Sequence, residues 1–184
     1  MNYMDCLGSS FPNIQAICFR DPFNYNDIQW EGGDPLPSKV VLDECVLHDT
    51  KAARIKELSL ACEKEIIGGF ESSALGTPAI YDSERVDQLN LIGATTATGP
   101  VTGVPEGFQG PYAVRPVVGG VIQPKEYVMH TYSQLRGVLL DGFNFKLARL
   151  QKFNDKRDYV NNVTATLADI DAVTWDSVET PPTP

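Results

Sequence analysis

The sequence predicts an α+β fold, in which a short antiparallel sheet is packed by two long helices and preceded by an extended N-terminal arm. Apolar residues recur with helical periodicity over residues 38–67 and again after residue 131. Between these helices lie short β-prone runs separated by glycine and proline, which is typical of antiparallel strands. The expected domain covers residues 38–178, with the arm at 1–37 and a proline-rich tail at 179–184.

The arm over residues 1–37 is expected to contain a hairpin. Residues 14–18 alternate as in a strand, residues 24–30 supply a second short strand, and the turn residues of 31–37 end it. A lone hairpin is only marginally stable in water. We therefore expect the arm to make contacts outside its own domain, for example with another subunit.

The first long helical pattern covers residues 38–67, with Ser38 as a candidate N-cap and Gly68-Gly69 as the stop. Its apolar positions permit two interpretations. In the favoured one, Asp49-Thr50 caps a second helix over 51–67, which packs on the sheet. In the other, one continuous helix carries a heptad stripe that makes contacts between chains. The residues of that stripe are Val41, Cys45, His48, Ala52, Ile55, Ser59, Cys62 and Ile66.

The next part of the chain predicts a short hairpin and a short helix. Residues 70–75 and 78–81 are the expected strands, and Gly76-Thr77 is the turn between them. The apolar residues of the helix that follows share one face: Val86, Leu89 and Ile92.

Residues 95–124 are rich in glycine and proline and are expected to form a long loop. At most two short strands interrupt it, near 112–115 and 117–122. Loops of this length in compact domains are often functional or are insertions. Residues 125–130 are expected to be the last strand of the sheet.

Thr131 and Gln134 form a predicted capping box at the start of the second long helix. That helix carries an apolar stripe, at Leu135, Leu139, Phe143, Leu147 and Leu150. Gly137 and Gly142 weaken the helix and predict close packing. A basic stripe on another face is interpreted as solvated: Lys146, Arg149, Lys152 and Lys156. A last short helix is expected over 166–173.

The net charge of −9 is concentrated at the two ends of the chain. Residues 1–37 carry five acidic side chains and one basic, residues 158–184 carry five acidic and none basic, and residues 38–157 carry fourteen of each. Nucleic acids and anionic membranes both attract clustered Lys and Arg, so neither is an expected partner. No apolar run approaches the roughly 18 residues that span a bilayer, and the N-terminus lacks the pattern of a secretory signal.

No catalytic, cofactor-binding or metal-binding residue is expected, and the chain is not expected to be an enzyme. His48 lies within a helical pattern and His130 precedes a helix cap, and neither has a Ser or Cys in a nucleophile motif. The carboxylates of Asp82, Glu84 and Asp87 are explained by the dipole of the helix that they precede. The glycine clusters do not form a phosphate-binding motif.

The four cysteines, Cys6, Cys18, Cys45 and Cys62, include no Cys-x-x-Cys pair, and the chain has only two histidines. This spacing is poor for zinc. The favoured interpretation is buried free thiols, with a disulfide or a metal site as alternatives. The match of residues 162–164 to a glycosylation acceptor is interpreted as coincidence.

Three short motifs occur in order along residues 52–176: Ser-Ala-Leu-Gly at 73–76, Asp-Gln-x-Asn-Leu at 87–91 and His-Thr-x-x-Gln at 130–134. Other characteristic positions are Cys62, Gly69, Phe70, Tyr81, Gly93 and Trp175. On these residues the chain resembles a domain of unknown function found in bacteriophage tail and tail-fibre proteins. The segment 95–124 is longer and richer in glycine and proline than the connection in that domain.

The resemblance implies a structural component of a phage tail, tail fibre or baseplate-adjacent assembly, which attaches or organises other virion proteins. Such a protein is made in the host cytoplasm and resides in the tail of the virion. Expected partners are other tail or fibre proteins and further copies of the chain, with a trimer favoured. The main alternative is a tail-fibre assembly chaperone that is absent from the mature particle. A glycan- or receptor-binding module is less favoured, because the 95–124 loop offers only Phe108 and Tyr112 as aromatic residues.

Overall fold

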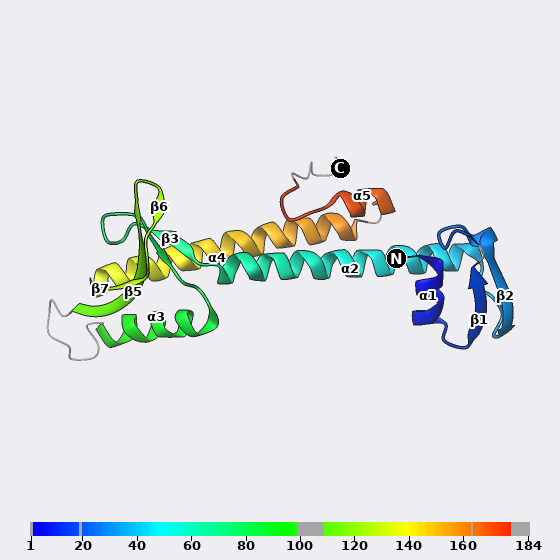
Figure 1. The fold of residues 1–184 in the computed structure, drawn as a ribbon, viewed down its shortest axis with the longest axis horizontal. Helices are drawn as coiled ribbons and strands as arrows, with labels where there is room; N and C mark the ends of the chain where they lie inside the picture. Colours follow the sequence, from blue (N-terminus) through cyan, green and yellow to red (C-terminus); the bar gives the residue numbers. More distant parts are fainter. Residues whose placement is uncertain (1, 19, 99–108, 163, 178–184) are drawn as a thin grey trace. The chain divides into compact units, whose positions relative to one another are not determined.

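The chain has the predicted α+β fold, with helices and short antiparallel strands (Figure 1). The computed structural model describes residues 2–18, 20–98, 109–162 and 164–177. The chain divides into two compact units: unit 1 comprises residues 1–59 and 155–184, and unit 2 comprises residues 60–154. Two long helices, α2 (Lys39–Ile67) and α4 (Tyr132–Asn161), each contribute residues to both units.

Unit 1 begins with a helix and a two-stranded antiparallel sheet. Its shorter elements are α1 (Tyr3–Ser10), β1 (Ile14–Cys18), the 3-10 helix η1 (Tyr25–Asp27), β2 (Ile28–Gly33) and α5 (Leu167–Ala172). The hairpin of β1 and β2 confirms the hairpin predicted within residues 1–37. Its second strand covers 28–33 rather than the predicted 24–30, because η1 occupies residues 25–27. Helix α1 was not predicted; the side chain of Asn2 caps it and Asp5 completes a capping box.

The N-terminal segment has its own partners within unit 1. Tyr3, Cys6 and Leu7 of α1 are buried in one cluster with residues of β2 and α2, namely Ile28, Leu42 and Val46. The Tyr3 hydroxyl donates to the Asp43 carboxylate, which also pairs with Lys39 at 2.6 Å. The hairpin that the sequence assigns to an extended arm is therefore supported by two helices of the same unit.

Cys6 and Cys45 form a disulfide, so their favoured interpretation as free thiols is wrong. Helix α1 turns Cys6 onto the buried face that meets α2, and the two Cα atoms lie 6.3 Å apart. The pairing was not predictable from the sequence, because the two cysteines are 39 positions apart and α1 was not predicted. Cys18 and Cys62 are free thiols, and Cys62 is buried.

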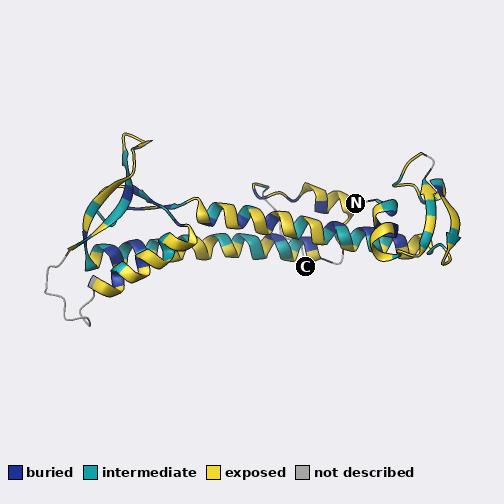
Figure 2. Ribbon diagram, turned by 60° about the horizontal axis from the view of Figure 1, so that its bottom comes forward, coloured by how far each residue is buried: buried dark blue, intermediate teal, exposed yellow. Residues whose placement is uncertain are grey.

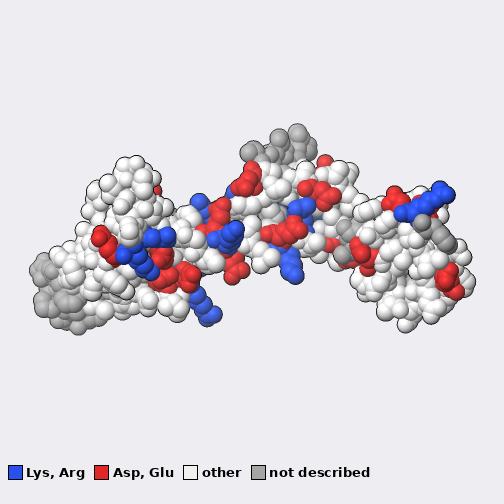
Figure 3. Space-filling view, in the orientation of Figure 1, with Lys and Arg blue, Asp and Glu red and all other residues white. Residues whose placement is uncertain are grey.

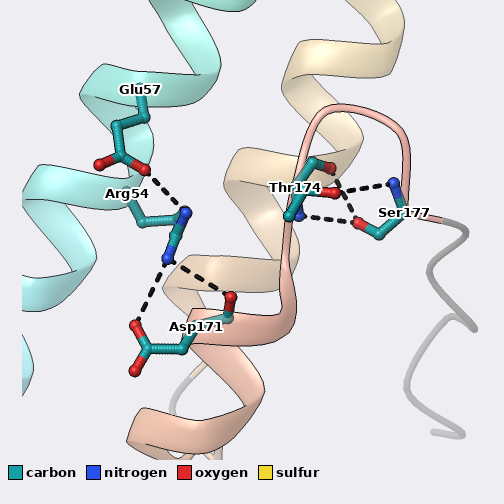
Figure 4. A network of polar contacts seen from close by, with 5 residues as sticks. All are labelled: Arg54, Glu57, Asp171, Thr174 and Ser177. Atoms are coloured by element: carbon teal, nitrogen blue, oxygen red, sulfur yellow. Dashed lines mark hydrogen bonds and ion pairs between the residues drawn. The ribbon is translucent and has the colours of Figure 1, made fainter.

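The remainder of unit 1 is held by polar contacts around α5 (Figure 4). Arg54 pairs with Glu57 at 2.7 Å and with the Asp171 carboxylate at 3.4 Å. The side chain of Lys156 is buried and donates to the backbone oxygen of Ser177 at 2.7 Å. Lys156 is therefore not part of a solvated basic stripe, contrary to the sequence prediction.

Unit 2 contains a five-stranded antiparallel sheet in the order β3-β4-β5-β6, with β7 also paired to β5. Its elements besides the long helices are β3 (Phe70–Ser72), β4 (Ala79–Tyr81), α3 (Arg85–Thr98), β5 (Gln109–Val118), β6 (Val121–Ile122) and β7 (Glu126–Thr131). Strand β5 is central because it changes partner along its length: it pairs with β7, then β4, then β6. The predicted hairpin and the predicted last strand are confirmed. Strand β3 is shorter than the predicted 70–75, because it ends at Ser72.

The prediction of a long loop over residues 95–124 is wrong at both ends. Helix α3 continues to Thr98, and β5 extends over ten residues; residues 99–108 lie outside the described part of the chain. Prolines misled the prediction, because proline usually interrupts a strand. Pro116 has no N–H to donate, but its carbonyl accepts from the Gln123 N–H at 2.8 Å. It lies at the end of the pairing of β5 with β4, next to the start of its pairing with β6.

Helix α2 is continuous from Lys39 to Ile67, so the interpretation as two helices is wrong. The expected cap residue Thr50 is buried within the helix. The buried apolar positions repeat in steps of four rather than as the predicted heptad: Leu42 and Val46, then Leu58, Cys62 and Ile66. Of the predicted stripe, Val41, His48, Ala52 and Ser59 are exposed.

The core of unit 2 is built on stacked aromatic rings between the sheet and α4. Phe70 stacks on Tyr81 with ring centroids 5.8 Å apart, and Tyr81 stacks on Tyr112 at 6.3 Å. The close packing predicted for Gly142 is confirmed: a Cβ at this position would lie 2.7 Å from Cζ of Phe70. The glycine therefore lets the Phe70 ring approach the backbone of α4.

We predict that Gly142→Ala destabilises the protein by about 1–3 kcal/mol, because the added methyl overpacks the Phe70 ring. Gly93→Ala in α3 is the matched control: no atom lies within 4 Å of its added Cβ. That control is expected to be neutral or to stabilise by up to about 1 kcal/mol through helix propensity. Urea unfolding measures both; equal effects of the two substitutions would contradict the proposed contact.

Candidate assembly surface

A buried histidine fixes the strand that leads into α4. The Nδ1 of His130 lies 2.7 Å from the carbonyl of Val128, which can only accept, so Nδ1 carries the proton. Nε2 then accepts from the hydroxyl of Tyr81 at 2.9 Å. Burial lowers the pKa of His130 and raises the pKa of Tyr81 to about 12, so both side chains are neutral near pH 7. His130 is thus a buried hydrogen-bonding residue.

The predicted capping box starts α4 immediately after this strand. The Gln134 backbone N–H donates to the Thr131 hydroxyl at 3.3 Å, and the Gln134 side chain accepts from the Thr131 N–H at 2.8 Å. Leu135 and Val138, in the first turns of the helix, are completely buried. The cap thereby sets which face of α4 meets the sheet and which face is left outside.

Large apolar side chains on α3 and α4 are exposed in unit 2 (Figure 2). We call this set the apolar face; it consists of Val86, Leu89 and Ile92 on α3 and of Leu140, Phe143, Leu147 and Leu150 on α4. Each of these side chains is between 40% and 65% exposed. Large exposed apolar side chains mark candidate interaction sites where they lie close together, as Ile92 and Phe143 do at one groove.

A groove of about 200 Å³ lies within the apolar face, between α3 and α4. Buried Phe70 and Leu91 are among its lining residues, with Gly142 beside them. The exposed Ile92 and Phe143 flank it from the two helices. Among the described residues that line the groove, only Lys146 is charged, and its Nζ donates to Gln88 at 3.4 Å.

The two units differ in charge. Unit 1 has fifteen acidic and seven basic side chains, a net charge of −8, whereas unit 2 has nine acidic and eight basic, a net charge of −1. A surface with little net charge does not repel its own copies, and a charge near zero promotes association. The apolar face is thus on the unit that is electrostatically suited to protein contacts.

The carboxylates singled out in the sequence lie beside α3, where they have structural partners. Asp82 pairs with Lys125 at 2.7 Å and with Arg115, and the Lys125 hydrogen bond, followed by the charge of Arg115, holds the pKa of Asp82 below its usual range. Asp87 accepts from the backbone N–H of Glu84 at 3.1 Å, as a capping carboxylate does. Asp82 and Asp87 line a polar cleft of about 280 Å³, but their oxygens already serve these contacts.

The other candidate residues are not brought together into a reactive site. His48 is exposed and lies 3.1 Å from the neighbouring carboxylate of Asp49. Asp49 lies near Cys6 and Cys45, and these three form the one cluster with metal-ligand atoms among the described residues. Thiolates bind metals, whereas the two sulfurs here are joined in a disulfide. In the acceptor motif, Asn162 Oδ1 accepts from the Thr164 N–H at 3.1 Å.

Lys146 and Arg149 of the basic stripe on α4 have partners within unit 2. Arg149 donates to the Glu65 carboxylate at 3.2 Å and lies 3.9 Å above the centroid of the Phe145 ring. With Lys146 bonded to Gln88, these cations contact the protein itself. The stripe therefore does not form a cluster of unpaired cations, which a phosphate backbone would need.

The apolar stripe that the sequence predicts on α4 is only partly buried. Leu135 is buried and Leu139 is partly buried, whereas Phe143, Leu147 and Leu150 are exposed. On α3 the buried residue is Leu91, whereas Val86, Leu89 and Ile92, which the sequence places on one face, are exposed.

Comparison of the chain with protein-family models, with curated proteins and with solved structures gives no match. Within the described residues, no helix combines the length and the apolar character that crossing a membrane requires.

We predict that acidification below about pH 6.5 destabilises the protein through His130. Its pKa is lowered on folding, so the unfolded chain takes up the proton first and unfolding becomes more favourable as pH falls. The loss is at most about 1.4 kcal/mol per pH unit for one such group. Urea unfolding between pH 5 and pH 7.5 measures it.

His130→Gln should flatten this pH dependence, although it lowers stability overall through the lost contact with Tyr81. His48→Gln, at the exposed histidine, is the control and should retain the slope of the wild type. An unchanged slope in His130→Gln would show that another group is responsible.

Proposed function

We propose that this chain is a structural, non-enzymatic component of a bacteriophage tail, tail fibre or baseplate-adjacent assembly. Its role is to attach or organise other virion proteins, and it acts as a homo-oligomer, with a trimer favoured. The single observation that carries the proposal is the apolar face, where seven large side chains of α3 and α4 are exposed on a nearly neutral unit. The virion setting comes from the resemblance of residues 52–176 described above.

The disulfide of unit 1 supports a protein that works outside a reducing cytoplasm. Disulfides persist in oxidising surroundings, including virion surfaces, and are rare in cytosolic proteins. Cys6 and Cys45 join α1 to α2, so the bond stabilises the N-terminal segment after release from the host.

The alternative, a tail-fibre assembly chaperone, is favoured by a different observation. A chaperone folds without its client, and the N-terminal segment of unit 1 buries Tyr3, Cys6 and Leu7 against its own chain. Under this alternative the apolar face of unit 2 holds a fibre protein transiently, and the chain is absent from the finished particle.

Quantitative mass spectrometry of purified particles tests the proposal. We expect the chain in a fixed copy number that is a multiple of three. Val86→Asp on the apolar face should reduce this number at least several-fold, because it places a charge in the contact. Absence of the wild-type chain from particles, with abundance in the lysate, would overturn the proposal in favour of the chaperone.

Val40→Asp is a closely matched control for this experiment. Val40 and Val86 are each the second residue of their helices, α2 and α3, and are 64% and 65% exposed. The control should enter particles as the wild type does. Equal incorporation of both variants would show that the apolar face is not used.

A further inference from the structure

The β5–β6 hairpin of unit 2 presents a rigid apolar tip. Val118 pairs with Val121 across a turn of Gly119 and Gly120, whose φ angles are +59° and +80°. A two-residue hairpin loop with positive φ at both residues is a type I′ turn, whose twist matches the right-handed twist of the flanking strands. Glycine adopts positive φ without strain. The Gln123 N–H donates to the Pro116 carbonyl at 2.8 Å and closes the base. The hairpin is therefore preorganised.

The tip is apolar and uncharged. Val118, Val121 and Ile122 are 63%, 61% and 53% exposed. The sequence from Pro116 to Pro124 contains no charged residue. Figure 3 shows the hairpin as a projection without charged side chains. Exposed apolar strands are usually flanked by charged side chains that prevent association with other strands. This hairpin has no such charged side chains.

The same unit offers a site of matching chemistry in the groove between α3 and α4. The groove volume of about 200 Å³ holds roughly seven groups of the size of a water or methylene, which corresponds to two aliphatic side chains. Its flanks, Ile92 and Phe143, are apolar and exposed, as is the hairpin. Both surfaces are uncharged apart from Lys146 at the groove.

The hairpin and the groove of one chain lie on opposite sides of unit 2. In the views of Figures 1 and 2 the β5–β6 hairpin projects from the sheet away from α3. The hairpin of a chain therefore does not reach its own groove, while it is free to reach that of another copy.

We propose that the β5–β6 hairpin of one copy docks into the α3–α4 groove of the next copy, with Val121 and Ile122 as its anchors. This inference rests on the proposed function in requiring that copies of the chain assemble. The contact is heterologous, since two different surfaces of the same unit meet, and contacts of this kind form a ring where the rotation between successive copies closes. The ring is the form that the favoured trimer takes.

The contact has the size of a weak pairwise interface, which forms at high concentration and which closure into a ring strengthens. We take the contact to consist of three side chains of the hairpin and five of the apolar face. If each loses on the order of 100 Å² of accessible surface, the contact buries roughly 800 Å² in total. This is below the roughly 1,200–2,000 Å² of stable pairwise interfaces. In a closed ring every copy makes two such contacts, so the last contact forms within one assembly at high effective concentration.

Two charge substitutions at closely matched exposure test the docking. Ile122→Asp alters the hairpin and Ile92→Asp alters the groove; the two residues are 53% and 50% exposed, so neither change disturbs the core. Sedimentation velocity of the full chain, over a hundredfold range of concentration, measures the mass. We expect the wild type to assemble and each variant alone to be monomeric.

The mixture of the two variants gives the discriminating result. An intact hairpin from Ile92→Asp meets an intact groove from Ile122→Asp, so one contact is restored and the mass becomes that of a 1:1 heterodimer at high concentration. A symmetric contact, such as α4 against α4, gives no such rescue. Val40→Asp serves as the control and should assemble like the wild type.

A wild type that is monomeric throughout overturns the docking, as does assembly of Ile122→Asp or a mixture that stays monomeric. If Ile122→Asp assembles, or if the mixture stays monomeric, the hairpin is not what fills the groove. The proposed function is then still supported if mass spectrometry finds the chain in particles at a fixed copy number. Absence from particles rejects the proposed function independently of the sedimentation result.

Discussion

The approach of the Phe70 ring to the backbone of α4 at Gly142 is the contact on which unit 2 depends. A side chain at that position would collide with the ring, so only glycine permits the sheet and the helix to meet so closely. The ring then stacks on Tyr81, and Tyr81 bonds to the buried His130 just before α4 begins. Position 142, the strand β7 and the start of α4 are thereby coupled through one aromatic cluster.

This close core also explains why the unit has an uncovered apolar face. Strands β3 and β4 have three residues each, and the core is satisfied by Leu135 and Val138 in the first turns of α4 and by Leu91 on α3. Phe145 of α4 still packs against Phe70 of the sheet, whereas Leu140 and Phe143 are exposed because they lie on another face of the helix. Burying them requires another surface, which is the physical basis for proposing an assembly role rather than a catalytic one.

Local sequence chemistry predicted much of unit 2. The capping box at Thr131, the glycine stop after α2 and the short β3–β4 hairpin depend on neighbouring residues, and each was found where expected. Partner-dependent features were not predictable in this way. The continuity of α2 through Asp49-Thr50, the Cys6–Cys45 bond and the length of β5 each depend on residues far along the chain. The exposed face was the hardest feature, because an apolar stripe has the same spacing whether it meets a core or a partner.

Hydroxyl-radical footprinting of the assembled and the dissociated protein tests the central claim most directly. We predict that oxidation of Phe143 and Leu89 falls several-fold on assembly, because the apolar face becomes covered. Leu60, which is 57% exposed on α2 outside this face, provides the internal reference and should react equally in both states. Equal oxidation of Phe143 in the two states would contradict the account, since the apolar face would then remain open to solvent in the assembly.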